Sequence, residues 1–332
     1  MVANIDSFAY TGEMPWHREG VQVENDLTPH EMMKAAKLDW TVSTYPIAAL
    51  LPDPQEEGSY SEAVMHPNRV ALMRDDREAA FLGICSSDYK PIQNERIFDF
   101  FKKFSEYANI TMETAGSLRD GRDIFGLAKL NDNFALPGGD ELKGYVLFHQ
   151  PHEPGYAMSI RDTEVRVVCS NTLQFALSGN ATSQYRMSHR SVFDSVREEQ
   201  ALKTMGAVYE RRKEFKEAAE FLSKTKAKHD NVVDFVAKLY NPKALEDYNP
   251  KEGPLVDFLN PTAKTVLEAL ESAPGAETKS AKGTWWGAVN AVTFLEDHLR
   301  EGENKVYNAM FGNTSAAKNR ALDLAITYAK AA

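Results

Sequence analysis

The chain has 332 residues, enough for one large domain or two ordinary ones, and its 43% hydrophobic and 26% charged residues are typical of a globular protein. It contains no apolar run of the ~20 residues that a membrane-spanning helix needs, and its N-terminus lacks the basic flank and apolar core of a secretory signal, so we expect a cytoplasmic protein with no membrane partner. The formal net charge of −10 predicts that the chain as a whole repels polyanions.

The first 90 residues combine one short helix with strands. The sequence Thr-Pro-His-Glu at positions 28–31 supplies a cap, a proline in the first turn and a glutamate three residues after the cap, which predicts a helix ending near Leu38. Alternating β-branched and aromatic residues predict a strand at Asp39–Ile47, and the Pro, Glu and Gly of Pro52–Ser61 predict a loop. Arg69–Arg74 and Ala79–Cys85 then form a predicted hairpin.

The middle of the chain alternates one amphipathic helix with further strands. Apolar residues recur at spacings of three and four through Ile97–Ala108, which predicts a helix. Thr111–Leu130 reads as a second hairpin that turns at an Asp-Gly pair. Further strands are predicted at 144–149, 156–161 and 164–169, and the Ser-Asn-Thr sequence at 170–172 is expected to cap a short helix.

From Val192 onward the pattern is helical. Val208, Phe215 and Leu222 recur at intervals of seven, which predicts a long helix at 195–228. Its apolar stripe is longer than a small sheet can cover, so we expect a homo-oligomer. Further helices are predicted at 232–239, 261–270, 285–299 and 315–331.

Adjacent hairpins followed by helices predict an α+β fold, with an antiparallel β-hairpin core wrapped by helices and an all-helical C-terminal third. The expected division is an α+β domain at 1–194 and a helical region at 195–332. The residues expected in the core are Phe98, Phe101, Phe104, Val146, Phe148, Val167, Phe175 and Trp286.

The sequence contains none of the common catalytic motifs. We find no P-loop, dinucleotide glycine fingerprint, zinc-protease helix or nucleophile elbow, and we expect no cofactor, no catalytic residues and, on balance, no enzyme. His149, His152 and Glu153 are the best metal ligands on offer, but no further Cys/His cluster completes a coordination shell, so we expect no metal site. Cys85 and Cys169 lie in apolar runs and are expected to be small buried hydrophobes.

A basic segment stands out against the acidic chain. Residues 165–229 hold 12 Lys and Arg against 7 Asp and Glu, a net charge of +5, and no acidic residue occurs from Val165 to Phe193. Arginines can pair with phosphates, and an aromatic ring can stack on a base. The residues predicted to bind nucleic acid are Arg166, Tyr185, Arg186, His189, Arg190, Arg211, Arg212 and Lys213.

Several blocks together resemble a phage/plasmid-like protein family catalogued as a domain of unknown function. The resemblance covers residues 10–325, although residues 148–156 depart from the block that the family usually has after its mid-chain strand. It implies a phage or mobile-element protein in a bacterial cytoplasm. The blocks that carry it are Trp40, Leu82-Gly83, Tyr89–Asn94, Thr114–Leu118, Arg166–Leu173 and Gly283–Thr293.

Three functions stay open from the sequence. The first is a protein of the annealing or recombination type that binds single-stranded DNA and assembles as a homo-oligomer. The second is an interaction protein, such as an anti-defence or host-takeover factor, for which an acidic surface is suited. The third is a nucleic-acid or nucleotide-processing enzyme.

Overall fold

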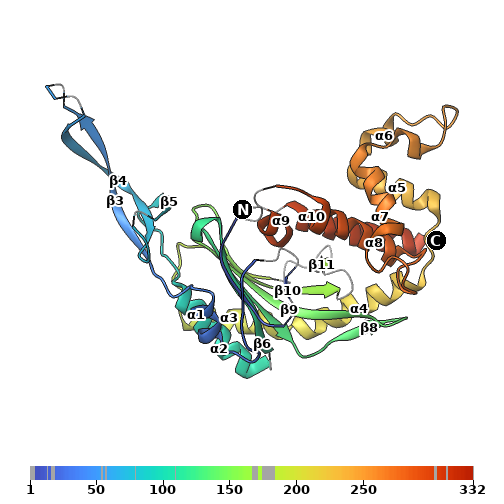
Figure 1. Cartoon of the computed structure of the whole chain (residues 1–332), viewed down its shortest axis with the longest axis horizontal. Coiled ribbons are helices and arrows are strands. Elements are labelled where there is room, and N and C mark those ends of the chain that lie inside the picture. The colour runs from blue at the N-terminus through green and yellow to red at the C-terminus, as the bar shows by residue number, and fades with distance from the viewer. Residues whose placement is uncertain are drawn as a thin grey trace.

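The computed structural model describes residues 4–12, 14–15, 19–53, 55–56, 58–78, 80–108, 110–166, 171–173, 184–302, 305–311 and 313–331. Within these residues a nine-stranded sheet lies at the centre, with helices on one side and a helical C-terminal part (Figure 1), which confirms the predicted α+β class. The sheet order is β11-β10-β9-β7-β6-β1-β2, with β12 paired to β10 and β8 to β9. Its pairings are antiparallel except for the short β1–β2 pair. Its strands are β1 (Ile5–Tyr10), β2 (Val21–Gln22), β6 (Ile110–Leu118), β7 (Asp123–Leu130), β8 (Phe134–Leu136), β9 (Asp140–Pro151), β10 (Met158–Arg166), β11 (Asn171–Leu173) and β12 (Gln184–Met187).

A second sheet of three strands has the order β3-β4-β5, with β3 at Val42–Pro52, β4 at Tyr60–Arg74 and β5 at Phe81–Ser86. Strands β3 and β4 form a long hairpin that extends away from the rest of the molecule (Figure 1). These strands are longer than predicted: the strand predicted at Asp39–Ile47 continues to Pro52, and the strand predicted at Arg69–Arg74 begins at Tyr60. The loop predicted at Pro52–Ser61 is therefore shorter than expected. We call the distal part of the hairpin, residues 48–65, the β-arm.

The helices are α1 (Pro29–Ala35), α2 (Asn94–Ala108), α3 (Ser195–Gly206), α4 (Val208–Lys224), α5 (His229–Tyr240), α6 (Pro242–Glu246), α7 (Pro261–Ser272), α8 (Trp285–Phe294), α9 (Lys305–Phe311) and α10 (Asn313–Ala331). Short helical turns add η1 (Arg119–Gly121), η2 (Leu255–Phe258) and the π-helical η3 (Leu295–Leu299). No helix in the described ranges has the length and apolar character to cross a membrane.

Local sequence rules explain several of these elements. The Thr28 side chain accepts a hydrogen bond from the Glu31 backbone N–H, and the Glu31 side chain accepts one from the Thr28 backbone N–H. The predicted capping box is therefore present at the start of α1. The predicted turn between β6 and β7 is also present. Arg119, Asp120 and Gly121 adopt positive φ there, and the absence of a Cβ on Gly121 leaves room for the Arg74 side chain.

Two predicted elements near the end of the sheet are different in the structure. The strands predicted at 156–161 and 164–169 are joined in a single β10 as far as Arg166. Asn171 and Thr172, expected to cap a helix, instead form β11, where they pair with Arg166 and Val165 of β10. The prediction of a helix cap was wrong. The backbone N–H and C=O groups along the edge of β10 need partners, and an extended strand at 171–173 supplies them, whereas a helix would not. Residues 174–180 lie outside the described ranges.

Three clusters of buried side chains stabilise the fold. Helices α1, α2 and α3 pack on one face of the sheet and bury Phe98, Phe101, Phe104, Val146 and Phe148, as predicted. The C-terminal helices enclose Trp286, also as predicted, in a second cluster that reaches the β8–β9 end of the sheet. A third cluster lies on the opposite face of the sheet, where residues of α9 contact it. Cys85 is buried as expected, whereas Val167, Cys169 and Phe175 fall outside the described residues.

The long helix predicted at 195–228 is two helices that join at Ala207. Met205 and Val208 belong to the first cluster, and Phe215 and Leu222 belong to the second. The apolar stripe is therefore covered within the chain and needs no second subunit. The homo-oligomer stays a prediction, and it would have to form through another surface. The division into two parts at residue 194 also stays a prediction; α3, which follows that point, packs on the sheet.

Candidate functional site

The predicted nucleic-acid residues occupy several different environments. Arg186, Arg190 and Lys213 have exposed side chains. Arg190 is 79% exposed and lies 3.5 Å from Asp88, a pair that solvent screens. Arg166 lies in β10, but its side chain is outside the described residues.

The two ring residues of the predicted interface are buried. Tyr185 is in the core that α2 and α3 cover, with its ring centroid 6.4 Å from that of Phe193. His189 stacks on Tyr89 at 4.7 Å, and burial lowers its pKa to about 4, so it is neutral at pH 7. In this arrangement Tyr185 offers no face to a base and His189 offers no positive charge to a phosphate.

Two of the predicted arginines pair with carboxylates of β10. Arg211 Nη2 lies 2.8 Å from Asp162 Oδ1, and Arg212 Nε lies 2.7 Å from Glu164 Oε1. These side chains fix α4 to the sheet, because Asp162 and Glu164 point toward the same face as α3 and α4. They are structural ion pairs within the chain.

The opposite face of the sheet carries the most distinctive charge arrangement. In register across the strands lie Phe125, His149, Ser159 and Arg186, with Arg161 diagonal to Arg186. Residues of α9 contact this face, which we call the α9 face: Phe311 stacks on His149 at 3.9 Å, and Met310 accepts a hydrogen bond from Arg161 Nη2 at 2.8 Å.

Arg161 is a largely enclosed cation. Its guanidinium lies 5.3 Å from the Phe311 ring, and its Nε is buried with no hydrogen-bond partner. Burial, followed by repulsion from Arg186, lowers the pKa of Arg161 to about 10, so it remains charged at pH 7. Among the described residues no carboxylate forms an ion pair with it. Within the described part of the chain, the α9 face therefore holds a positive charge that no carboxylate compensates.

A compensated cluster lies beside it on the same face. Asp123 accepts from Arg119 Nε at 2.5 Å and is 2.7 Å from His149 Nε2. Burial opposes the ionisation of Asp123, but these two hydrogen bonds bring its pKa below its ordinary value. Burial lowers the pKa of His149, so the imidazole is a neutral donor to the carboxylate.

Two tyrosines flank this cluster. The Arg119 guanidinium lies 4.4 Å from the Tyr307 ring and 5.9 Å from the Tyr156 ring. Tyr156 is 46% exposed, so its ring is accessible from solvent. The α9 face thus combines cations with an accessible aromatic ring. The sequence analysis had predicted the same combination, but with Tyr185 as the aromatic ring.

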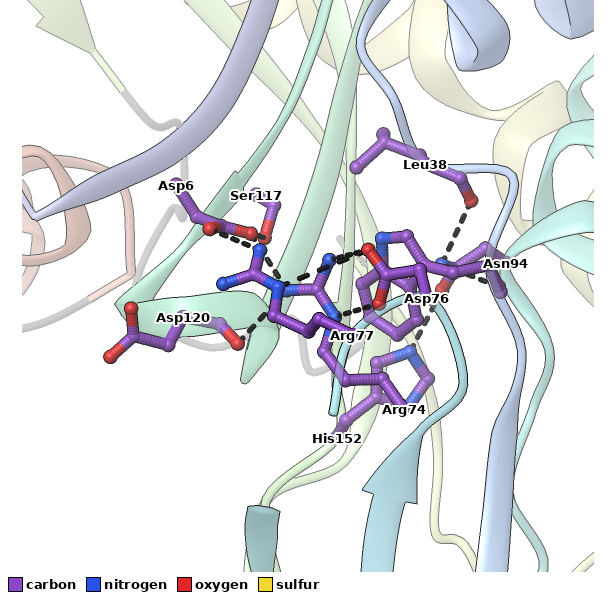
Figure 2. Close-up of polar contacts among 10 residues, drawn as sticks. Asp6, Leu38, Arg74, Asp76, Arg77, Asn94, Ser117, Asp120 and His152 are labelled. Carbon is purple, nitrogen blue, oxygen red and sulfur yellow. Dashed lines mark hydrogen bonds and ion pairs between the residues drawn. The ribbon is translucent and has the colours of Figure 1, made fainter. Parts of the chain in front are cut away.

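A separate buried network joins the β3–β4 hairpin to the body (Figure 2). Arg74, at the end of β4, pairs with Asp6 at 2.7 Å and Asp76 at 2.6 Å, and its guanidinium lies 4.1 Å from the Trp40 ring. Figure 2 shows these carboxylates converging on the arginine. Arg74 therefore fixes the base of the hairpin to β1.

The same network accounts for His152. The Asn94 amide donates to the Leu38 carbonyl, so its oxygen accepts from His152 Nε2 at 2.8 Å. Burial lowers the pKa of His152 to about 3, which keeps it neutral. His149 and His152 thus have different partners, and the described part of the chain contains no group of three His, Cys, Asp or Glu that could hold a metal ion.

Sequence reasoning missed Arg119, Tyr156, Arg161 and Tyr307. Alternation along β10 places Arg161 on the face opposite to Ile160, a signal available from the sequence. Whether a given arginine meets a carboxylate depends on distant strands, however, and no local pattern distinguishes Arg161 from Arg211.

A family model described as Domain of unknown function (DUF932) matches residues 81–325, which include β7, β9, β10 and β12. No curated protein and no solved structure matches the chain significantly. Because the match covers more than half of the residues, the chain belongs to the family described as Domain of unknown function (DUF932).

Proposed function

We propose that the protein binds single-stranded nucleic acid through the α9 face, with backbone phosphate held by Arg161 and Arg186. The observation that carries this proposal is the enclosed Arg161 guanidinium, which pairs with no carboxylate in the described residues. An enclosed charge without a counterion is costly, and a bound anion offsets that cost.

The geometry favours an extended polyanion over a small one. Arg161 is enclosed, whereas Arg186 on the neighbouring strand is exposed, and Arg190 follows that strand and lies beside Asp88, just after β5. Proteins that hold single strands with low sequence preference use several spaced cations to follow the phosphate backbone, and these three arginines come from β10, β12 and the loop after β12. The phosphate contacts now centre on Arg161, Arg186 and Arg190.

The proposal predicts a steep dependence of affinity on salt. Each phosphate contact to a single strand contributes a slope of roughly −0.7 in log affinity against log salt concentration. Arg186→Ala/Arg190→Ala removes two contacts, so we expect the slope to become shallower by about 1.4 and affinity at about 50 mM salt to fall at least tenfold. Fluorescence anisotropy with a labelled oligonucleotide of about 30 nucleotides measures both quantities.

The matched control is Lys243→Ala/Lys251→Ala, which removes two exposed charges in and just after α6, in the C-terminal helical part. It should leave the slope unchanged. Absence of binding by the unaltered protein at low salt contradicts the proposal. Equal weakening by the control and by Arg186→Ala/Arg190→Ala shows that only the net charge matters and that the site is misplaced.

A second prediction concerns the accessible ring. Replacing Tyr156 with alanine should weaken binding by about 1–3 kcal/mol, because a base that stacks on an aromatic side chain loses its platform. Tyr185→Phe is the control, since the Tyr185 ring is buried and its change should leave affinity unaltered. The same anisotropy titration measures both. A larger effect at Tyr185 than at Tyr156 contradicts the assignment.

A second candidate function is a protein–protein interaction factor without catalytic activity. The observation that favours it is the exposed apolar surface of the β-arm. An origin in a phage or mobile element and a place in the bacterial cytoplasm are further proposals, which depend on the resemblance described above. Titration with oligonucleotides of DNA and RNA separates the two candidate functions, because an interaction factor of this kind binds neither.

A further inference from the structure

The β-arm is apolar on both of its faces. In the distal part of the hairpin Ala48 pairs with Met65, and Leu50 pairs with Ala63, so Leu50 and Met65 lie on one face. Ala49 pairs with Val64, which places Val64 on the other face together with Leu51. Leu50 and Met65 are 54% and 55% exposed, and Leu51 and Val64 are also exposed.

An isolated two-stranded hairpin has little stability in water, because neither face is buried. The β-arm extends beyond the body without cover on either side (Figure 1). Its base, by contrast, is held firmly by the ion pairs of Arg74. A hairpin that is held firmly at its base and has two exposed apolar faces is typical of a surface that becomes buried in an assembly.

The charge of the hairpin identifies the chemistry of its partner. No Lys or Arg occurs from Val42 to Asn68, whereas Asp53, Glu56 and Glu62 lie in or beside the β-arm. This charge repels phosphate, so nucleic acid and anionic membranes are poor partners. A basic protein surface is complementary to it.

This chain carries such a surface elsewhere. Its segment 165–229 has a formal net charge of +5, which becomes +3 when Arg211 and Arg212 are counted as neutralised by Asp162 and Glu164. Lys213, Lys216 and Lys228 of this segment are exposed, and so are the apolar Val192 and Val196. The β-arm extends away from its own body (Figure 1), so only another molecule can bring the two together.

Prolines indicate how the contact is made. Pro46 and Pro52 lie in β3 and Pro67 lies in β4, and none of them has a backbone N–H to donate. Prolines on edge strands disfavour the addition of a further strand, so open-ended extension of the sheet is blocked. The contact therefore uses the side chains of the β-arm faces.

We propose that the β-arm docks on a second copy of this chain in a reciprocal dimer. Its apolar faces pack against the partner molecule, and its acidic side chains face the basic segment of that molecule. Exchange of identical elements buries the same surface twice and closes the assembly at two subunits. This inference is independent of nucleic-acid binding by the α9 face.

The test is the mass of the full chain at micromolar concentration, measured by size-exclusion chromatography with light scattering. We expect a dimer for the unaltered protein and a monomer for Leu50→Ser/Met65→Ser. The matched control Phe258→Ser/Leu299→Ser changes two comparably exposed residues outside the β-arm and should remain dimeric. Circular dichroism verifies that each variant is folded.

A charge variant provides a second measurement that does not depend on the apolar substitution. Glu62→Lys changes an exposed β-arm carboxylate, and we expect it to raise the dimer dissociation constant at least about tenfold, with the difference shrinking as salt screens the contact. If the unaltered protein is a monomer, the proposal is wrong. This holds even if the β-arm is then found to bind a different protein. Equal masses for the unaltered protein and both β-arm variants overturn it as well.

Discussion

Trp286→Ala is expected to lower the free energy of unfolding by about 3–5 kcal/mol, the usual cost of truncating a buried large aromatic side chain. Trp286 is fully buried in the C-terminal cluster and packs edge-on against Phe215. Its Nε1 also donates to Asp140 Oδ2 at 3.2 Å, and Asp140 accepts from Ser280 as well. The substitution therefore creates a cavity and removes one hydrogen bond to a buried carboxylate.

Urea unfolding followed by circular dichroism measures this loss. Trp286→Phe keeps most of the apolar volume but not the indole N–H, so its loss should be smaller, about 1–3 kcal/mol. Phe101→Ala tests the first cluster in the same way and should show a loss close to that of Trp286→Ala. Val21→Ala, at an exposed position, is the control. Unchanged midpoints for Trp286→Ala and Phe101→Ala contradict both core assignments.

Arg212→Met is expected to destabilise the protein by a similar amount, about 3–5 kcal/mol, because it leaves a buried charge unpaired. Glu164 is buried on the sheet, and the Arg212 guanidinium donates to it through Nε and Nη2. The same guanidinium also donates to the Asp132 carbonyl and packs where Gly144 has no side chain. The matched variant Arg212→Met/Glu164→Leu removes both charges and should recover most of the loss.

The pH dependence of the single variant provides an independent measurement. Burial raises the pKa of Glu164 from 4.5 to about 7 even with Arg212 present, and the loss of Arg212 raises it further. Since the folded pKa exceeds the unfolded one, the folded state binds the proton more strongly, and stability falls as pH rises from about 4.5 through the folded pKa. Arg212→Met should therefore regain stability on acidification toward pH 5, whereas the double variant, which lacks this carboxyl, should not. Identical pH profiles for the two variants contradict this account.

Elements determined by near neighbours in the chain were predictable. The capping box of α1, the aromatic stripe of α2 and the Asp-Gly turn between β6 and β7 each depend on residues within a few positions of one another. Periodicity also predicted that Phe101 and Trp286 are buried. The α+β class follows from the order of these elements along the chain.

The candidate site was only partly predictable, because its properties depend on pairs that are distant in sequence. Arg161, Arg211 and Arg212 are similar in local pattern, yet Asp162 and Glu164 neutralise the last two across 49 and 48 residues, whereas Arg161 faces the other side of the sheet. Likewise, the absence of acidic residues from Val165 to Phe193 led to the prediction that Tyr185 stacks on a base. Side chains alternate along β12, however, so the Tyr185 ring lies in the core and Arg186 is exposed.

By itself, the sequence determined the class of the fold, the capped and periodic helices, the tight turn and the basic character of residues 165–229, because each depends on composition or short-range spacing. Only the tertiary structure decided which cations have partners, that the stripe on α3 and α4 is buried inside the chain, and that the β-arm is uncovered. The physical reason is that ion pairing and burial depend on which surfaces meet, and those contacts join residues that are far apart along the chain.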